Sequence, residues 1–313
     1  MTIKEKNLKV KVITIVLSLL LAAGLIIFSG SSAGREFWQR LNSSESPSGI
    51  PTEMLENPLA VYFLDVGKAD SIIIRCDDKN ILIDAGTYED AETVEVWLKK
   101  LEIERLDIVF ATHPDSDHIG GMAHILGSFE VGELVKSNVP RELTDDKLEY
   151  RLMISAAEEN GIPIKTAEPG GLFDCGKGRL EILGPVGEHT DTNNYSLVQK
   201  LTYGNRSILF CGDIEERAEK KLRKSDADLT ADVIKVAHHG SKTSSSKKFL
   251  RAVDADYAVI STGPDNNKLP YKKVLERLEE LDIEIYRTDL DGTVMLCSDG
   301  EALEIITENE INK

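Results

Sequence analysis

The chain has 313 residues, of which 41% are hydrophobic and 29% charged, with only 10 prolines. This composition can bury a core of up to about two domains, which excludes wholesale disorder and low-complexity fibres. Residues 1–50 carry +3 of the net charge of −17, so the remaining 263 residues carry −20. A body this acidic is a poor general binder of polyanions, and any contact with nucleic acid must be local.

The first predicted element is an export segment. Four lysines precede an uncharged run from Val12 to Ser32. We therefore expect residues 1–33 to be a signal peptide or a single membrane anchor, since the run is long for the first and short for the second. Small residues permit cleavage before Gly34. The leading lysines predict an extracytoplasmic body, either secreted or held at the membrane by an uncleaved segment. A buried helix of a soluble domain is the weaker alternative.

Residues 34–58 contain Ser, Pro and Gly and are predicted to be a linker, followed by a domain at 59–307 and a tail at 308–313. Within the domain, short β-branched runs alternate with amphipathic stretches, which favours an α/β layered fold. The predicted strands are 61–64, 71–75, 81–83, 108–111, 134–136, 180–183, 197–202, 207–210, 233–237, 258–261, 284–286 and 294–297. The predicted helices are 93–101, 117–127, 146–160, 215–224, 246–253 and 271–281.

The four cysteines are far apart and form no Cys-x-x-Cys pair, which excludes a zinc ribbon and a thioredoxin-type motif. Two of them lie in apolar, strand-like runs. Small buried hydrophobic side chains are favoured over a disulfide, although export would allow one. The four are Cys76, Cys175, Cys211 and Cys297.

Residues that can bind metal follow three of the predicted strands. The densest group has four such side chains in six positions, and the others are Asp213 and the pair His238-His239. A tight turn can aim all four side chains of the first group into one cleft, where a metal would offset their desolvation. The four are His113, Asp115, Asp117 and His118.

The alternative is that these residues are structural. Asp115 or Asp117 can cap a helix, with His118 incidental. Metal binding is favoured because a cap needs only one carboxylate. Taken singly, Asp213 can equally cap the helix that follows it, and His238 and His239 are as easily loop residues as ligands.

Together these motifs resemble those of the metallo-β-lactamase superfamily. The ordered set is Ile83-Asp84-Ala85-Gly86, Thr112-His113-x-Asp115-x-Asp117-His118, Gly212-Asp213 and His238-His239-Gly240-Ser241. The chain is most similar to the extracellular hydrolase-like domain of ComEC-type competence proteins, over about residues 59–307. The residues that carry this closer likeness are Phe63 to Ser71, Asp115 in place of a histidine, Asn193 to Leu197, and Tyr286 to Gly292.

The resemblance implies a four-layer αββα sandwich with two divalent metal ions, Zn²⁺ or Mn²⁺, between the sheets. It implies that His113, Asp115 and Asp213 bind one metal. The other metal would take Asp117, His118, the same Asp213 and one histidine of the pair. Because Asp115 stands in place of a histidine, the first metal has mostly oxygen ligands, which favours Mn²⁺ or a labile Zn²⁺.

Further roles follow from the same resemblance. We favour His238 as the ligand and His239 as a proton donor nearer the substrate, with the reverse order left open. Asp117 is a catalytic candidate besides its place among the ligands. Asp84 is expected to orient the histidine-rich turn through hydrogen bonds. Asn194 lies near the position of another usual histidine, for which His189 is a fallback.

The segment after the histidine pair, residues 240–248, contains three lysines in an otherwise acidic body. It is predicted to contact substrate phosphate, or alternatively to be a solvated loop. The substrate-binding candidates are Ser241, Lys242 and Asn194.

These observations predict an exported di-metal phosphodiesterase that cleaves DNA, with a separate DNA-uptake channel as a further candidate partner. One alternative keeps the metals but changes the substrate to a cell-wall phosphoester, such as phosphocholine or teichoic acid, or to a lactone or β-lactam. The other is a surface binding module in which the metals are structural.

Overall fold

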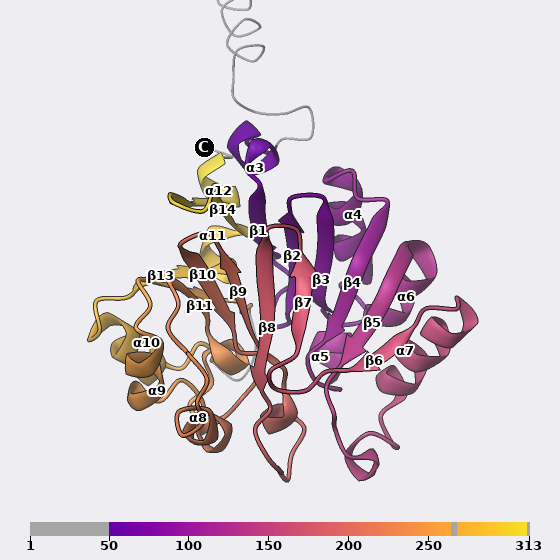
Figure 1. Ribbon diagram of the computed structural model, residues 1–313. Coiled ribbons are helices and arrows are strands. Elements are labelled where there is room, and N and C mark those ends of the chain that lie inside the picture. Colours follow the sequence, from indigo (N-terminus) through magenta and orange to yellow (C-terminus); the bar gives the residue numbers. More distant parts are fainter. Residues whose placement is uncertain (1–49, 264–267, 312–313) are drawn as a thin grey trace, which may run out of the picture. The chain divides into compact units, whose positions relative to one another are not determined.

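The computed structural model describes residues 50–263 and 268–311 (Figure 1). The chain divides into two compact units, and the second, Glu53–Lys313, contains the sheets. The predicted export segment, 1–33, and the first part of the linker lie outside the described residues. Among the helices that the structure does describe, none has the length and apolar character needed to cross a membrane.

The strands of this unit alternate with helices through most of the chain. The strands are β1 Leu59–Phe63, β2 Ser71–Cys76, β3 Lys79–Ala85, β4 Arg105–Ala111, β5 Glu130–Lys136, β6 Ile164–Thr166, β7 Leu172–Cys175, β8 Gly178–Gly184, β9 Val198–Tyr203, β10 Arg206–Phe210, β11 Val233–Lys235, β12 Tyr257–Ile260, β13 Glu284–Arg287, β14 Val294–Ser298 and β15 Leu303–Thr307. The helices are α3 Thr52–Glu56, α4 Ala91–Lys100, α5 Ser116–Ile119, α6 Met122–Ser128, α7 Leu148–Glu159, α8 Glu216–Leu222, α9 Lys247–Val253, α10 Lys272–Glu279, α11 Thr288–Asp291 and α12 Glu308–Ile311, with single 3₁₀ turns η1 Arg141–Leu143, η2 Asn193–Tyr195 and η3 Ala237–Gly240.

The strands form two mixed sheets. The first has the order β15-β14-β1-β2-β3-β4-β5-β6 and the second the order β13-β12-β11-β10-β9-β8-β7. In the first sheet the strands from β3 to β6 are parallel, and in the second those from β10 to β13 are parallel. Parallel strands release their following loops at a common sheet edge, which is where binding sites of α/β proteins form.

The sheets pack face to face through alternating side chains. In β1, Val61 and Phe63 enter the core between the sheets, and the ring of Phe63 lies 6.2 Å from that of Phe210 in the second sheet. Tyr62 points to the opposite face, where its ring lies 6.2 Å from that of Trp97 in α4. Because both faces are covered, β1 is buried along its whole length.

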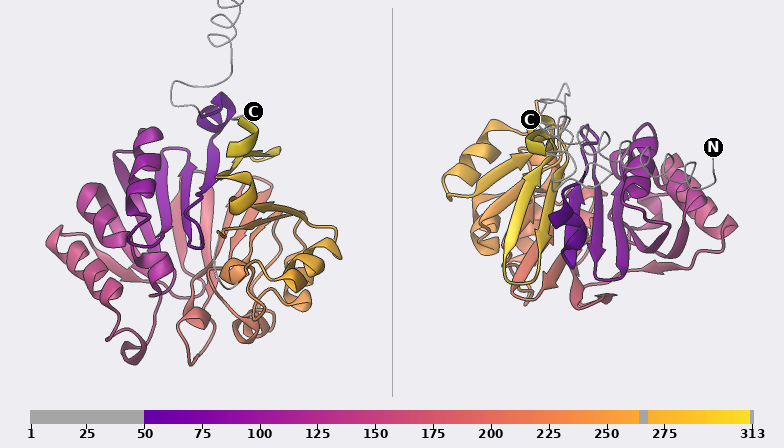
Figure 2. Two further views of the ribbon diagram at one scale, coloured as in Figure 1. Left: turned by 180° about the vertical axis from the view of Figure 1, so that it is seen from behind. Right: turned by 90° about the horizontal axis from the view of Figure 1, so that it is seen from above.

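Helices cover the outer face of each sheet, as Figure 2 shows from behind and from above. The second sheet packs against Leu222 of α8, Phe249 of α9 and Leu278 of α10 in a second apolar core. On the first sheet, α4, α6 and α7 each bury an apolar stripe. The four layers are therefore helix, sheet, sheet and helix, the architecture expected from the sequence.

Most predicted elements match the structure to within a few residues, with two kinds of exception. The single predicted helix 117–127 is wrong, because the chain breaks at Gly120-Gly121 into α5 and α6. A Cβ on Gly121 would lie 2.3 Å from the carbonyl oxygen of Ala85, so this segment touches the end of β3 at backbone distance. Three short strands, β6, β7 and β15, and three short helices, α3, α11 and α12, were not predicted.

Ordered structure extends beyond both limits predicted for the domain. Helix α3 lies within the predicted linker, and the Tyr62 hydroxyl donates a hydrogen bond to the carbonyl of Met54 at 3.2 Å. Helix α12 lies in the predicted tail, where the amide of Glu308 donates to the carbonyl of Thr293. All four cysteines are in the described part of the chain, are buried and form no disulfide.

Candidate metal centre

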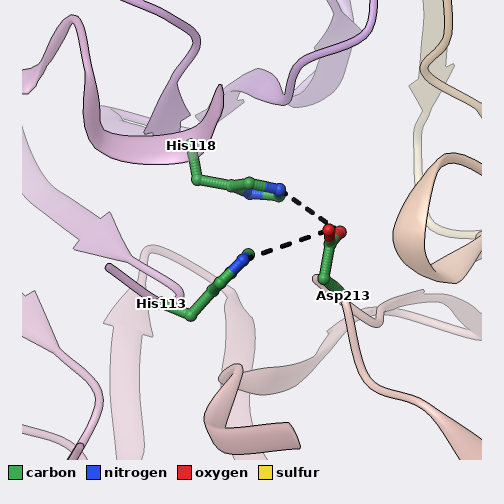
Figure 3. A group of neighbouring side chains, drawn as sticks. All are labelled: His113, His118 and Asp213. Carbon is green, nitrogen blue, oxygen red and sulfur yellow. Dashed lines mark ion pairs between the residues drawn. The ribbon is translucent and has the colours of Figure 1, made fainter. Parts of the chain in front are cut away.

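Three loops that follow parallel strands bring the predicted ligands together. The turn from His113 to His118 follows β4 in the first sheet, and Asp213 and the pair His238-His239 follow β10 and β11 in the second. The site therefore lies between the two sheets, at their common edge. Figure 3 shows that His113 and His118 both point toward Asp213.

The distances at this point suit shared cations. Nε2 of His118 lies 3.2 Å from one carboxylate oxygen of Asp213, and Nε2 of His113 lies 4.0 Å from the other. Nε2 of His113 is also 3.8 Å from Asp115. Two ligand atoms that are each about 2.1 Å from one cation lie roughly 3–4 Å apart.

Hydrogen bonds fix the tautomer of His113. The Thr112 hydroxyl donates its only proton to Asp84 at 2.6 Å and lies 3.1 Å from Nδ1 of His113. The hydroxyl can therefore only accept from His113, so Nδ1 carries the proton and Nε2 presents a lone pair. Asp84 also accepts from the amide of Thr112 at 2.9 Å and pairs with Nδ1 of His118 at 2.7 Å. Asp84 thus fixes the ring of His118 and the start of the turn.

His239 is held in the same way from the second sheet. Its Nδ1 lies 3.0 Å from the carbonyl oxygen of Ser261, which can only accept, so Nε2 again presents a lone pair. That Nε2 lies 3.7 Å from a carboxylate oxygen of Asp117 and 3.7 Å from Asp213. Asp117, His118 and His239 form a group whose ligand atoms all lie within 4.8 Å of one another.

Four atoms at the centre support metal binding. They are buried and have no hydrogen-bond partner among the described residues: Nε2 of His113, His118 and His239, and Oδ1 of Asp213. Unpaired buried polar atoms are costly, so four that converge on one point need a common partner. Imidazole and carboxylate ligands suit a divalent cation, and these residues fit such ions.

The electrostatics of the centre are those of a crowded set of ligands. Burial, with the neighbouring His118, lowers the pKa of His113 to about 4. Burial alone would raise the pKa of Asp213, but the rings of His118 and His239 hold it well below its usual value. For His118 burial is outweighed by Asp213 and Asp84, which raise its pKa well above the usual value. Asp213 is therefore an anion at neutral pH.

Two lysines that were not predicted as site residues flank the ligands. Nζ of Lys68 lies 2.7 Å from Oδ2 of Asp117, and Lys147 forms an ion pair with Asp115. Asp115 also accepts from the Thr192 hydroxyl at 2.9 Å. The two carboxylates of the turn thus face cationic side chains from the β1–β2 loop and from the start of α7.

A buried ion pair supports the floor of the site. Nζ of Lys235, in β11, lies 2.9 Å from Asp70, and both side chains are at most 3% exposed. Asp70 also lies 3.7 Å from Nδ1 of His239 and 4.0 Å from Nδ1 of His118. Sequence reasoning assigned neither residue a role. The available signal was a lysine inside the apolar run that forms β11.

Two other predicted site residues, His238 and Asn194, lie in different surroundings. His238 lies 3.8 Å from Asp213, but its side chain is 21% exposed, whereas His239 is buried. Asn194 is buried, and its side-chain oxygen accepts from the amides of Glu215 and Ala218. Asn194 therefore holds the start of α8, and its predicted contact with substrate stays a prediction.

Two further candidates follow the histidine pair along the chain. Lys242 is exposed and lines a cavity next to α8. The hydroxyl of Ser241 lies 3.1 Å from that of Thr243. The fallback histidine, His189, lies outside the groups of residues that face Asp213 in the described structure, and its ring packs against Tyr195 at 5.3 Å.

Comparison with known proteins gives several relatives. ComE operon protein 3 of Bacillus subtilis (strain 168) is 29% identical over 255 residues, which cover 75% of this chain and 32% of that protein. Competence protein ComA of Neisseria gonorrhoeae is 28% identical over 285 residues, 89% of this chain and 38% of that protein. The predicted resemblance to competence proteins is confirmed. The chain spans about a third of the length of these relatives.

Among solved structures, the diiron β-hydroxylase CmlA from Streptomyces venezuelae aligns with a TM-score of 0.51 at 13% identity. The alignment covers 80% of this chain and 55% of CmlA. At this identity the likeness shows a shared fold only. The model of the metallo-β-lactamase superfamily matches residues 64–263, which hold every ligand candidate named above. The chain belongs to the metallo-β-lactamase superfamily.

Proposed function

We propose that this protein is a di-metal phosphodiesterase that cleaves DNA outside the cytoplasm. The observation that carries the proposal is the set of three imidazole nitrogens and one carboxylate oxygen that are buried, have no hydrogen-bond partner among the described residues, and are directed at one point. Two divalent cations would supply Lewis-acid stabilisation of charge on the substrate oxygens and make water a stronger nucleophile.

The residues divide into two sets around Asp213. His113 and Asp115 would hold one cation, and Asp117, His118 and His239 the other, with Asp213 shared. This assignment reverses the order favoured from the sequence for the histidine pair. It rests on the burial of His239 and on its bond to Ser261, which leaves Nε2 free for a cation.

His238 is then available for the substrate. It follows β11 in a left-handed backbone conformation, with φ of 53°, and its side chain reaches the surface. A non-glycine residue held in this region is strained, and such strain concentrates at functional sites. We propose that His238 donates a proton to the leaving oxygen.

Three features support an anionic phosphodiester as the substrate. Lys68 and Lys147 stand beside the ligand carboxylates and would attract a negatively charged substrate. The carboxylates of Asp115, Asp117 and Asp213 offset only three of the four positive charges of two dications. The names of the relatives connect this type of domain with competence, which makes DNA the polymer that we propose.

The test uses the full chain, purified without chelator, whose metal content is measured before activity. We expect about two equivalents of bound Mn²⁺ or Zn²⁺, and metal-dependent cleavage of single- or double-stranded DNA. His113→Ala and Asp213→Ala should each lower the cleavage rate by 100-fold or more, in line with the loss of a cation. Cleavage that persists in both variants would refute the assignment.

Matched variants separate the centre from the rest of the surface. His124→Ala removes a histidine of α6 that is 41% exposed, and it should leave cleavage unchanged. His239→Ala should lose about one metal equivalent, whereas His238→Ala should retain both and lose rate. A panel of teichoic acid, phosphocholine esters and a chromogenic β-lactam tests the other substrates, and turnover of one of these without DNA cleavage would replace DNA as the substrate.

Export is the part of the proposal that depends on residues outside the described structure. Protease added to intact cells should digest the protein if its body lies outside the cytoplasm. Resistance in intact cells, with digestion after lysis, would contradict it.

A further inference from the structure

Five basic side chains line two cavities that border α8. They come from α8, from the residues just after it, from the loop after His239 and from the start of α9, and we call them the α8 basic surface. All five are exposed, and none forms an ion pair with any residue that the structure describes. The five residues are Arg217, Lys220, Lys224, Lys242 and Lys248.

Arg217 and Lys220 lie three residues apart in α8, the spacing of neighbours along a helix face, and Lys224 follows the end of the helix. These three line one cavity of about 360 Å³. Lys242 and Lys248 line another cavity of about 270 Å³, which Glu216 of α8 also borders. Both cavities thus border α8.

The α8 basic surface differs in charge from the acidic protein as a whole. The residues that line the two cavities include eight basic and three acidic side chains, in a chain whose net charge is −17. Of the three acids, Glu188 accepts from the Tyr195 hydroxyl and Asp191 accepts from Asn194. A local excess of exposed cations raises the concentration of anions beside it.

Hydrogen bonds fix this surface relative to the centre. Helix α8 begins three residues after Asp213, and its first amide, that of Glu216, donates to the carbonyl of Thr243 at 3.0 Å. The buried carboxylate of Glu219 accepts from the amides of Ser245 and Ser246. The helix and the segment after His239 are thus bound to each other. In Figure 1, α8 lies at the same end of the two sheets as α5.

We propose that the α8 basic surface binds the phosphate backbone of a DNA strand and leads it to the metal centre. This inference rests on the function proposed above and adds where the rest of the polymer lies. Contacts to phosphate are independent of base sequence and depend on salt. A small diester that fits only the centre would not reach these side chains.

Binding in the presence of EDTA tests the surface without requiring cleavage. The affinity of the full chain for labelled oligo(dT) is measured by fluorescence anisotropy across a series of salt concentrations. In the triple variant Arg217→Gln/Lys220→Gln/Lys224→Gln, the slope of log K against log salt should become shallower by about 2, because each phosphate contact to a single strand contributes about 0.7. Affinity at low salt should fall about tenfold.

A control with the same change in charge separates a local surface from net charge. Lys99→Gln/Lys177→Gln/Arg179→Gln removes three exposed cations from α4 and the β7–β8 hairpin and should leave the slope unchanged. Equal effects of the two triple variants, or no effect of the first, would overturn the proposal. Stronger competition by poly(glycerol phosphate) than by unlabelled DNA would overturn the choice of nucleic acid. Melting temperatures confirm that each variant is folded.

The metal-loaded enzyme gives a second readout. The α8 triple variant should raise KM for long DNA and leave kcat/KM for bis(p-nitrophenyl) phosphate unchanged. An equal loss on both substrates would place these residues in the centre and contradict the proposal. If the chain cleaves nothing, the function proposed above fails, while the binding result in EDTA still decides the fate of the surface.

Discussion

At the scale of single residues, Thr112 links His113 and His118 through hydrogen bonds. Its hydroxyl accepts from His113 and donates to Asp84, which in turn pairs with His118. One hydroxyl therefore fixes a tautomer on one ring and helps to place the carboxylate that holds the other. Such outer contacts commonly govern metal affinity as strongly as the ligands themselves.

We predict that Thr112→Val weakens metal binding by about 10- to 100-fold, because the methyl group fills the space but cannot accept from His113. Isothermal titration with Mn²⁺ and with Zn²⁺ measures this change. Thr112→Ser retains the hydroxyl and should bind within a few-fold of the unchanged protein. Equal affinities for the valine and serine variants would show that the hydroxyl has no part in the site.

The pair formed by Asp70 and Lys235 gives a prediction about stability. Removing one partner leaves the other as an unpaired charge in the core, so Lys235→Met should lower the free energy of unfolding by about 3–5 kcal/mol. Urea denaturation, carried out in EDTA so that no metal is bound, measures this free energy. The double variant Asp70→Leu/Lys235→Met should recover much of the loss, since neither charge is then left alone. Additive losses in the double variant would contradict this explanation.

At the scale of elements, the break between α5 and α6 sets the position of the ligand turn. Gly121 touches the carbonyl of Ala85 at the end of β3, the strand that also carries Asp84. Close backbone contact holds α5 against this strand. His118 and Asp84 can then meet at 2.7 Å.

Gly121→Ala should therefore lower the free energy of unfolding by about 1–3 kcal/mol and reduce metal affinity, because the added methyl group forces α5 away from β3. Gly127→Ala is the matched control in α6, where a Cβ meets nothing within 4 Å. That change should stabilise the protein by about 0.5–1 kcal/mol. Thermal unfolding and metal titration of both variants decide the matter. If Gly121→Ala changed neither the stability nor the metal affinity, the contact between Gly121 and Ala85 would not be needed.

At the scale of the whole molecule, the ligand candidates come from both sheets. His113 and His118 extend from the first sheet, and Asp213 and His239 from the second. A cation held by both sets would cross-link the sheets in the folded state only. Metal binding and folding are then coupled.

We expect saturating metal to raise the free energy of unfolding by about 3 kcal/mol at 100 times Kd. Differential scanning calorimetry with Mn²⁺ or with EDTA measures the shift in Tm. In Asp213→Asn the two traces should nearly coincide, because the shared ligand is weakened on both sides. A full shift in this variant would exclude Asp213 as the bridge between the sheets.

The local pattern of apolar residues was sufficient to predict most of the strands and helices. Apolar runs such as 71–75 and 207–210 predicted strands because neighbouring side chains of a strand face opposite layers, and both layers here are buried. The short edge strands β6 and β7 escaped prediction because their side chains are largely exposed and carry no apolar run. The break at Gly120-Gly121 depends on contact with β3, which local pattern does not include.

The order of residue types at the ends of β4, β10 and β11 was sufficient to predict the family and the ligand candidates. The packed sheets were needed to show that Lys235 pairs with Asp70 across 165 residues, that Lys68 faces Asp117, and that His239 rather than His238 turns inward. Periodicity records only which side of its own element a residue occupies. Its partner on another element is fixed only when the two sheets pack.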